Sequence, residues 1–359
     1  MATPKHLMRL SVVGGLFVCL LGTTNCRKVV LRAFLDGYQQ TNLVASNASY
    51  SPVLVDSQLV NPWGMAFTPT SPVWISDNGT GLSTLYDHTG KKIPLVVTIP
   101  SPDSAKEGKP TGVLFNPTAD FMIPAKPPVA SRFIFATEDG TIIAWGGGTK
   151  GTIVADRSEW GAVYKGIALD STGGQHFLYA TNFHAGTIDV FDKDFNYVSG
   201  TTFHDPGIPH GFAPFNIRSI GGWLWVTYAK QLAPADHYDE AGPGNGFIDI
   251  FTPGGALVSR FATRGPLNSP WGIVPAKEGF VKQADSVNVI LVGNFGDGRI
   301  NMYTDQGIFL GPLMDHNRPI VIGGLWDLEN DVPGTTTAQL FFTAGPNGSD
   351  GIFGFLERK

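Results

Sequence analysis

The sequence predicts an all-β protein, a six-bladed β-propeller with four-stranded blades around a central channel, and three observations support this. A pattern occurs six times: a small or aromatic residue, a glycine and an apolar run, then a strand with a polar end, a glycine-rich turn and another strand. The repeats are about 50 residues apart, the length of a blade of four short strands. The 45 glycines and 26 prolines supply many turns, and only 15% of residues are charged.

The six repeats are aligned on one position near the start of each first strand. That position is predicted at residues 64, 112, 166, 216, 272 and 324, which gives spacings of 48, 54, 50, 56 and 52. The predicted strands are short, rich in β-branched and aromatic residues, and bounded by Gly, Pro, Asn and Asp. A pair of β-sandwiches is the alternative, but it would not explain why six segments share one order of signals.

Inner strands of a propeller are covered on both faces by neighbouring blades, so they can be apolar throughout. The segments 133–136 and 289–292 have this character. Ring closure protects sheet edges. We expect residues near 38–55 to supply an outer strand beside the last blade.

The N-terminus has the pattern of an export signal. Lys5 and Arg9 precede the apolar stretch 10–21, which is shorter than a membrane span. Cys26 follows at the position of a bacterial lipoprotein acceptor, although Asn25 stands where a small residue is expected. We therefore predict a lipoprotein-type signal peptide over 1–25, a tether over 26–40 and a single propeller domain over 41–359. The alternative is an ordinary signal peptide, with an incidental Cys26 and a secreted soluble protein.

The processed chain would be acidic and would contain one cysteine. Removing residues 1–25 takes away Lys5, Arg9 and Cys19, and leaves 23 basic against 30 acidic residues, a net charge of −7. No internal disulfide is then available, and no basic stripe suited to nucleic acid is visible. We expect a monomer that faces the periplasm or the outer cell surface and contacts the membrane only through the lipid.

The starts of first strands and the ends of second strands meet on one face of a propeller, where function usually lies on loops. This reasoning predicts a set of ligand-binding residues in the channel mouth. They are Asn61, Trp63, Lys165, Asn216, Tyr228, Lys230, Trp271 and Trp326. The three tryptophans fall at nearly equivalent positions and form either a stacking floor for a ligand or packing between blades. The long insertion 228–246 is predicted to cover one mouth.

Four oxygen-bearing side chains are predicted to occupy matching places in four blades: Asp77, Glu138, Asn182 and Asn294. Carboxylate and amide oxygens that arrive from several directions suit a hard cation such as calcium, the possible cofactor. The alternative is structural, because Asp and Asn before Gly form turns. No nucleophile elbow, phosphate loop, dinucleotide fingerprint or cysteine cluster is present, so no catalytic residue is assigned.

Several segments carry a resemblance to a known family. They include Leu59–Gly64, Ser76–Gly81, Ala136–Thr141, Ala213–Ile217 and Gly293–Asn301. Over roughly residues 38–356 the chain resembles a family of exported bacterial proteins of uncharacterised function, some of which end in a PEP-CTERM sorting tail that this chain lacks. More broadly it is similar to NHL-type propellers and, distantly, to the gluconolactonase group. The resemblance implies the fold and export, and no activity.

Two functions remain open. One is a binding module of the cell envelope that takes a small-molecule, glycan or envelope-protein ligand. The other, by fold-level analogy, is a calcium-dependent hydrolase of lactones or esters that uses the channel.

Overall fold

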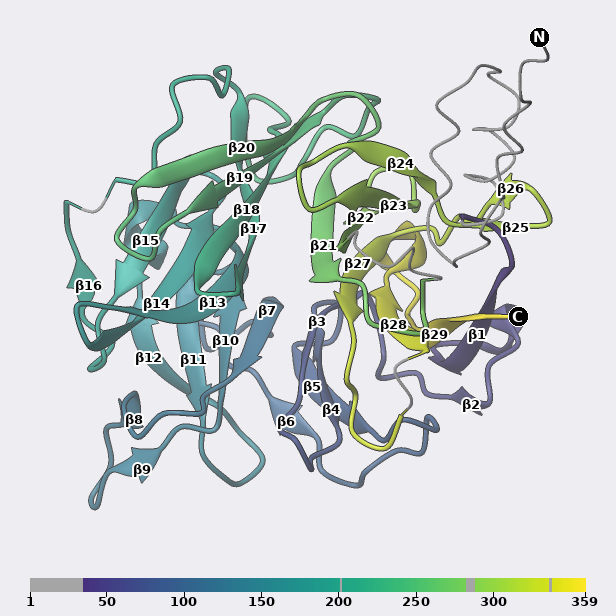
Figure 1. The fold of residues 1–359 in the computed structure, drawn as a ribbon. Helices are drawn as coiled ribbons and strands as arrows, with labels where there is room; N and C mark the ends of the chain where they lie inside the picture. Colours follow the sequence, from purple (N-terminus) through teal and green to yellow (C-terminus); the bar gives the residue numbers. More distant parts are fainter. Residues whose placement is uncertain (1–34, 201, 282–287, 336–337) are drawn as a thin grey trace, which may run out of the picture.

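The computed structural model describes residues 35–359 except 201, 282–287 and 336–337. Six blades surround a central axis, as predicted (Figure 1), and each is built on four antiparallel strands, to which a short parallel strand is added in the last blade. In each blade the first strand is innermost, and the chain then steps outward strand by strand.

The first three blades are built as follows. Blade 1 contains β3 (Pro62–Ala66), β4 (Val73–Asp77), β5 (Leu82–Tyr86) and β6 (Val97–Thr98). Blade 2 contains β7 (Pro110–Phe115), β10 (Phe133–Thr137), β11 (Thr141–Trp145) and β12 (Thr152–Asp156), and the hairpin β8 (Met122–Ile123) and β9 (Val129–Ala130) is inserted in it. Blade 3 contains β13 (Tyr164–Thr172), β14 (Gln175–Asn182), β15 (Thr187–Phe191) and β16 (Tyr197–Val198).

The remaining blades follow the same order. Blade 4 contains β17 (Phe212–Ile220), β18 (Trp223–Lys230), β19 (Gly246–Phe251) and β20 (Leu257–Thr263). Blade 5 contains β21 (Pro270–Pro275), β22 (Val289–Asn294), β23 (Ile300–Thr304) and β24 (Phe309–Pro312), and is followed by the hairpin β25 (Met314–Asp315) and β26 (Arg318–Pro319). Blade 6 contains β27 (Leu325–Glu329), β28 (Gln339–Ala344) and β29 (Ile352–Arg358).

The two ends of the described chain close the ring in blade 6. Strand β1 (Tyr38–Ala45) pairs antiparallel with β29, and β2 (Leu54–Val55) pairs with β1. This confirms the predicted closure by residues near 38–55. Strand β1 begins three residues before the predicted domain start at 41, so Tyr38–Gln40 belong to the propeller and not to the tether.

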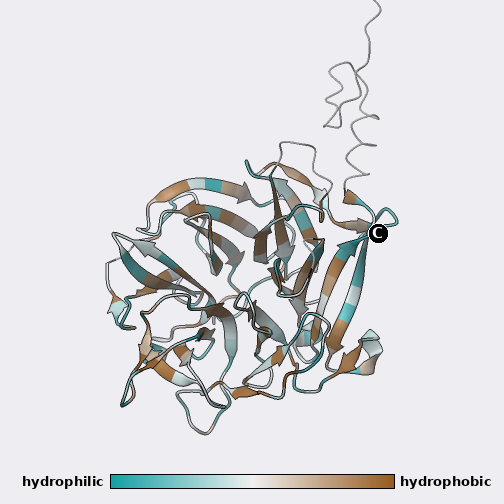
Figure 2. Cartoon of the chain, turned by 60° about the horizontal axis from the view of Figure 1, so that its bottom comes forward, coloured by the Kyte–Doolittle hydropathy of each residue, from teal (hydrophilic) through white to brown (hydrophobic). Residues whose placement is uncertain are grey.

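Six of the seven hydrophobic clusters among the described residues lie between neighbouring blades, and the seventh gathers residues around the central axis. Alternate residues of one strand serve opposite clusters: Phe133 and Phe135 face blade 1, whereas Ile134 and Ala136 face blade 3. This explains the apolar runs that lack alternation. In Figure 2 the brown, hydrophobic stretches lie along the strands that form the ring.

The inner strands approach one another so closely that most of them carry glycine at the same level. A Cβ on Gly64 would lie 2.8 Å from the Val113 nitrogen, and one on Gly272 would lie 2.8 Å from the Trp326 oxygen. Leu325 of β27 pairs with the second strand as Pro62 of β3 does, so the two residues are equivalent. Residue 327, two positions later, is therefore equivalent to Gly64. The predicted equivalence of residue 324 is therefore wrong by three positions, because the sixth repeat has Asp327 where most others have glycine.

The predicted signal peptide 1–25 and Cys26 lie outside the described residues. In the part of the chain that the structure describes, no helix is long and apolar enough to cross a membrane.

Candidate ligand site at one mouth of the channel

A cavity of about 680 Å³ opens at the end of the channel where the inner strands begin. Its walls come from three sources: the starts of inner strands, the segments just after second strands, and the loop 231–245 between β18 and β19. The convergence predicted from the sequence is therefore observed. The loop contributes His237, Tyr238 and Asp239, which confirms that the insertion covers this mouth.

A buried ion pair between Lys165 and Glu138 lies in the cavity wall. The two side chains form a close Nζ–Oε1 contact, and they are 1% and 9% exposed. Glu138 also accepts a hydrogen bond from Asn78 Nδ2 at 2.9 Å and lies 3.4 Å from His237 Nε2. The carboxylate thus joins blades 1, 2 and 3 to the loop that covers the mouth.

The surroundings of Glu138 favour its charged form. Burial alone would raise the pKa of this carboxyl, but the charge of Lys165 and the hydrogen bonds from His237, Lys165 and Asn78 outweigh burial and lower the pKa to about 2. The Lys165 Nζ also lies 5.1 Å from the centroid of the Trp63 ring and 5.4 Å from that of Tyr238. These rings add cation–π attraction to the ion pair.

The floor of the cavity is a layer of aromatic side chains. Trp326 is stacked between Trp63, with ring centroids 3.5 Å apart, and Phe295, at 4.0 Å. Trp271 meets both tryptophans edge-on at 6.2 and 6.0 Å. All three tryptophans are at most 4% exposed. Their faces are occupied by one another, so they act as packing between blades, the alternative that the sequence left open.

Two buried polar atoms of the lining have no hydrogen-bond partner within the described structure. One is a donor, Trp63 Nε1, and the other is an acceptor, Asp239 Oδ2, which lies near the equally unpartnered hydroxyl of Ser269. Burial raises the pKa of Asp239, and also that of Asp139 in the same wall. Buried polar groups are normally paired, so the two orphan atoms indicate places where a ligand could supply the missing partners.

The predicted ligand-binding residues divide into three groups. Asn61, Trp63, Lys165 and Trp326 line the cavity. Asn216 and Trp271 instead line a second cavity at the opposite end of the channel.

The last two predicted residues serve other contacts. Tyr228 is buried in the core between blades 3 and 4, and Lys230 pairs with Glu240 at 2.7 Å. Neither of them lines the cavity.

The four predicted metal ligands do not converge. Asp77 accepts hydrogen bonds from the backbone and hydroxyl of Thr84 in its own blade. Asn182 bonds Asp189, and Asn294 bonds the Pro266 carbonyl and Asp297. Of the four, only Glu138 lines the cavity.

The reason is a one-residue error in the predicted alignment. Asp77, Asn182 and Asn294 each pair with the first residue of their inner strand, and in blade 2 that place belongs to Thr137. Glu138 is one residue later, equivalent to Asn78, and successive residues of a strand point to opposite sides. The calcium-dependent hydrolase has no site among these four residues.

Several lining residues were not assigned as ligand-binding from the sequence, including Asn78, Lys109, Asp139, Tyr238, Asp239 and Phe295. In the correct register, Asn78, Glu138 and Phe295 occupy equivalent positions in their blades and would have been predicted to lie at the same level. Lys165 also stands out in that register, since its equivalents are Trp63, Thr111, Phe215, Trp271 and Trp326.

Comparison with curated proteins identifies relatives in Acanthamoeba polyphaga mimivirus. The uncharacterised protein R648 is 31% identical over 327 residues, which cover 88% of this chain and 79% of R648. The uncharacterised protein L690 is 31% identical over 331 residues, 88% of this chain and 85% of L690. These relatives are viral and not bacterial as the resemblance predicted, although they are likewise uncharacterised. No protein-family model matches the chain.

Two solved structures share the propeller fold. A streptogramin B lyase aligns with a TM-score of 0.53 and 13% identity over 90% of this chain and 97% of the lyase. An auxiliary nutrient binding protein from Bacteroides ovatus aligns with a TM-score of 0.52 and 12% identity over 83% of this chain and 70% of that protein. At this identity the similarity concerns the fold alone.

Proposed function

The chain belongs to the same family as the uncharacterised mimivirus proteins R648 and L690, and we propose that it is a binding module for a small neutral ligand with several hydroxyl groups, such as a carbohydrate. The observation that carries the proposal is the pair of unpartnered polar atoms in the cavity lining, Trp63 Nε1 and Asp239 Oδ2. A hydroxyl group both donates and accepts, so a polyol can satisfy the two together.

The charges of the cavity support a neutral ligand. The ammonium of Lys165 and the carboxylate of Glu138 already neutralise each other. Asp139 Oδ2 accepts a hydrogen bond from the Lys109 backbone nitrogen at 2.7 Å. A charged ligand would compete with these contacts, whereas a neutral polar ligand adds to them. The cavity also has the size usual for a small-molecule site.

The loop 231–245 supports capture of the ligand. Its Gln231 donates to the Phe183 carbonyl at 2.6 Å, and the Ala235 carbonyl lies 3.1 Å from His184 Nδ1. These contacts fix the loop on blade 3 and leave Tyr238 over the mouth, 61% exposed. An exposed aromatic ring at the rim suits contact with the apolar face of a sugar.

The test is a glycan array with the purified protein, followed by calorimetric titration of the best sugar. Asp239→Ala should weaken binding about tenfold, the cost of one lost hydrogen bond. Glu240→Ala removes the neighbouring carboxylate, which lies outside the cavity, and should leave the affinity unchanged. Absence of any sugar binding, or equal affinity of the two variants, would contradict the proposal.

We also propose that the protein is exported and anchored through a lipid on Cys26. The support is in the sequence: Lys5 and Arg9, the apolar stretch 10–21, and then a cysteine. Labelling of expressing cells with a fatty-acid analogue should mark the protein, and Cys26→Ser should abolish the label. A label that survives the substitution would place the lipid on another residue, and no label on the original protein would leave the secreted soluble form.

A further inference from the structure

A second cavity, of about 320 Å³, opens at the opposite end of the channel. All six inner strands contribute to its walls, and it shares no lining residue with the cavity described above. The aromatic layer and the glycine level lie between the two, since Trp63 lines one cavity and its neighbour Trp271 lines the other. The two cavities are therefore separate.

The walls of this second cavity combine polar and apolar surface in about equal measure. Phe67, Leu114, Phe115 and Leu169 are half-buried residues at the far ends of the inner strands. Burial of such partly exposed surface favours a ligand with an apolar body. A volume near 320 Å³ suits a ligand of side-chain size or slightly larger.

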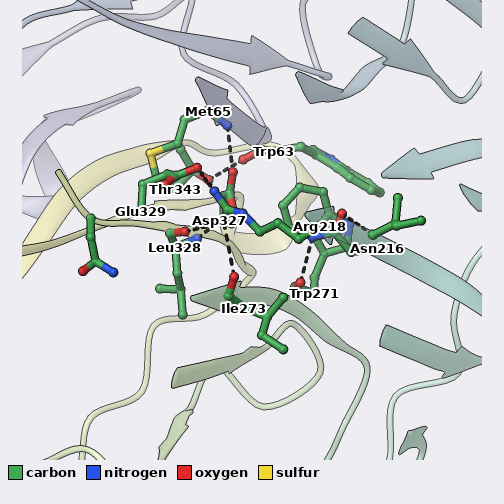
Figure 3. Close-up of polar contacts among 12 residues, drawn as sticks. Trp63, Met65, Asn216, Arg218, Trp271, Ile273, Asp327, Leu328, Glu329 and Thr343 are labelled. Carbon is green, nitrogen blue, oxygen red and sulfur yellow. Dashed lines mark hydrogen bonds and ion pairs between the residues drawn. The ribbon is translucent and has the colours of Figure 1, made fainter. Parts of the chain in front are cut away.

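The ionisable groups of the lining are Arg218, Asp327 and Glu329. Arg218 extends from blade 4 to blade 6, where Nη1 donates to the Leu328 carbonyl at 2.8 Å and lies 3.3 Å from Asp327 Oδ1 (Figure 3). Its Nη2 forms a close ion pair with Glu329 Oε1. The guanidinium is thus already shared by two carboxylates.

The two carboxylates differ in their partners and in their burial. Asp327 accepts hydrogen bonds from the backbone nitrogens of Met65 and Leu328, each at 2.9 Å, as well as from Arg218. Burial raises the pKa of Asp327, and the charge of Arg218 opposes this. Glu329 is 15% exposed, and among the described residues no donor reaches its Oε2. At the rim, Ser219 donates to a third carboxylate, Asp170, at 2.6 Å.

We propose that this second cavity binds an organic cation, a primary ammonium group carried by an apolar body. The Arg218 guanidinium is shared by two carboxylates, and Glu329 Oε2 is the free acceptor for the ammonium. The apolar body lies against Phe67, Leu114 and Leu169. An anion would need Arg218, whose charge the carboxylates already neutralise.

Three probes of one shape test the proposal: n-hexylamine, hexan-1-ol and hexanoate, each titrated into the purified protein by NMR or calorimetry. Hexylamine should bind at least about tenfold more tightly than hexanol, the value of one charge-assisted hydrogen bond, and hexanoate should not bind. Equal binding of amine and alcohol would reveal a merely apolar cavity. Preference for hexanoate, or no hexylamine binding at millimolar concentration, would overturn the proposal.

Two variants locate the charge that is responsible. Glu329→Gln keeps the side-chain shape and should weaken hexylamine about tenfold, whereas Glu159→Gln removes the same charge from an exposed position and should have no effect. Should Glu329→Gln fail to fold, Leu114→Lys tethers an ammonium at the half-buried rim and should abolish hexylamine binding. Unchanged hexylamine affinity in a folded Glu329→Gln or Leu114→Lys protein would contradict the proposal.

Discussion

The two ends of the channel each contain a buried carboxylate paired with a cation, and the pKa values of the two carboxylates move in opposite directions. At the loop-covered end, the pKa of Glu138 falls to about 2. At the opposite end, burial raises the pKa of Asp327 above its ordinary value of 3.8 despite the charge of Arg218. Burial is almost the same, because Glu138 is 9% and Asp327 is 7% exposed.

The difference lies in how much positive charge each carboxylate receives. Lys165 pairs with Glu138 and with no second carboxylate among the described residues, and Asn78 donates a further hydrogen bond. Arg218 divides its charge between Asp327 and Glu329. The pKa of a buried carboxylate therefore depends more on how much of the counter-charge it receives than on whether a cationic partner is present.

The largest effect should come from removal of the layer that keeps the two ends apart. Trp326→Ala deletes a ring stacked on both faces, and we expect a loss of about 4 kcal/mol in the free energy of unfolding. Urea denaturation measures it. Trp160→Ala, at a side chain 64% exposed, should cost below about 1 kcal/mol. Similar losses for the two variants would contradict a packed layer at the centre of the channel.

The next effect compares the two buried carboxylates directly. Glu138→Gln leaves the Lys165 ammonium buried without its counter-charge, and we expect it to cost about 3 kcal/mol at neutral pH. Asp327→Asn should cost less, because Arg218 keeps Glu329 and because burial already disfavours the charged form of Asp327. Urea denaturation of both variants gives the order. A larger loss for Asp327→Asn would reverse the comparison.

The pH dependence should separate the same residues by sign. The folded-state pKa of Glu138 lies below its ordinary value of 4.5, so its contribution to stability is complete above that pH and is lost as the pH falls toward 2. The folded-state pKa of Asp327 is raised, so its contribution is present below 3.8 and is lost as the pH rises through the folded value.

Unfolding measured from pH 2 to pH 7 tests both signs. Glu138→Gln should remove about 3 kcal/mol of the acid-side loss. Asp327→Asn should leave the loss of stability at acid pH unchanged and should reduce any loss of stability toward neutral pH. An acid limb that is unchanged in Glu138→Gln would show that this ion pair does not set it.

The sequence was sufficient for the fold because the repeated signals are local. Glycines and prolines mark the turns, and strands such as Phe133–Thr137 are apolar on both faces because a blade lies on each side. The closing strand could also be predicted, since closure of the ring requires an outer strand beside the last blade and residues near Tyr38 supply it.

The site was predicted less well because it depends on register. The prediction placed Glu138 level with Asp77, although Thr137 is the residue at that level. It therefore grouped Glu138 with Asp77, Asn182 and Asn294 as a metal site. It also separated Glu138 from its true neighbour Asn78. Asp327 was missed for a related reason, because the sixth repeat lacks the glycine that marks this level in most others. Arg218 lies on the far half of an inner strand, where no repeated signal marks a function.

The smallest predicted effect concerns an exposed ion pair at the same mouth of the channel as the buried pair of Glu138 and Lys165. Lys230 Nζ lies 2.7 Å from Glu240 Oε1, with side chains 38% and 45% exposed. Water and salt screen such a pair, so Glu240→Gln should cost at most about 0.5 kcal/mol, and 1 M salt should reduce even that. Glu138→Gln should keep most of its cost in the same salt, because its pair is shielded from solvent. A Glu240→Gln cost near that of Glu138→Gln would mean that the loop 231–245, and not burial of charge, stabilises this end of the channel.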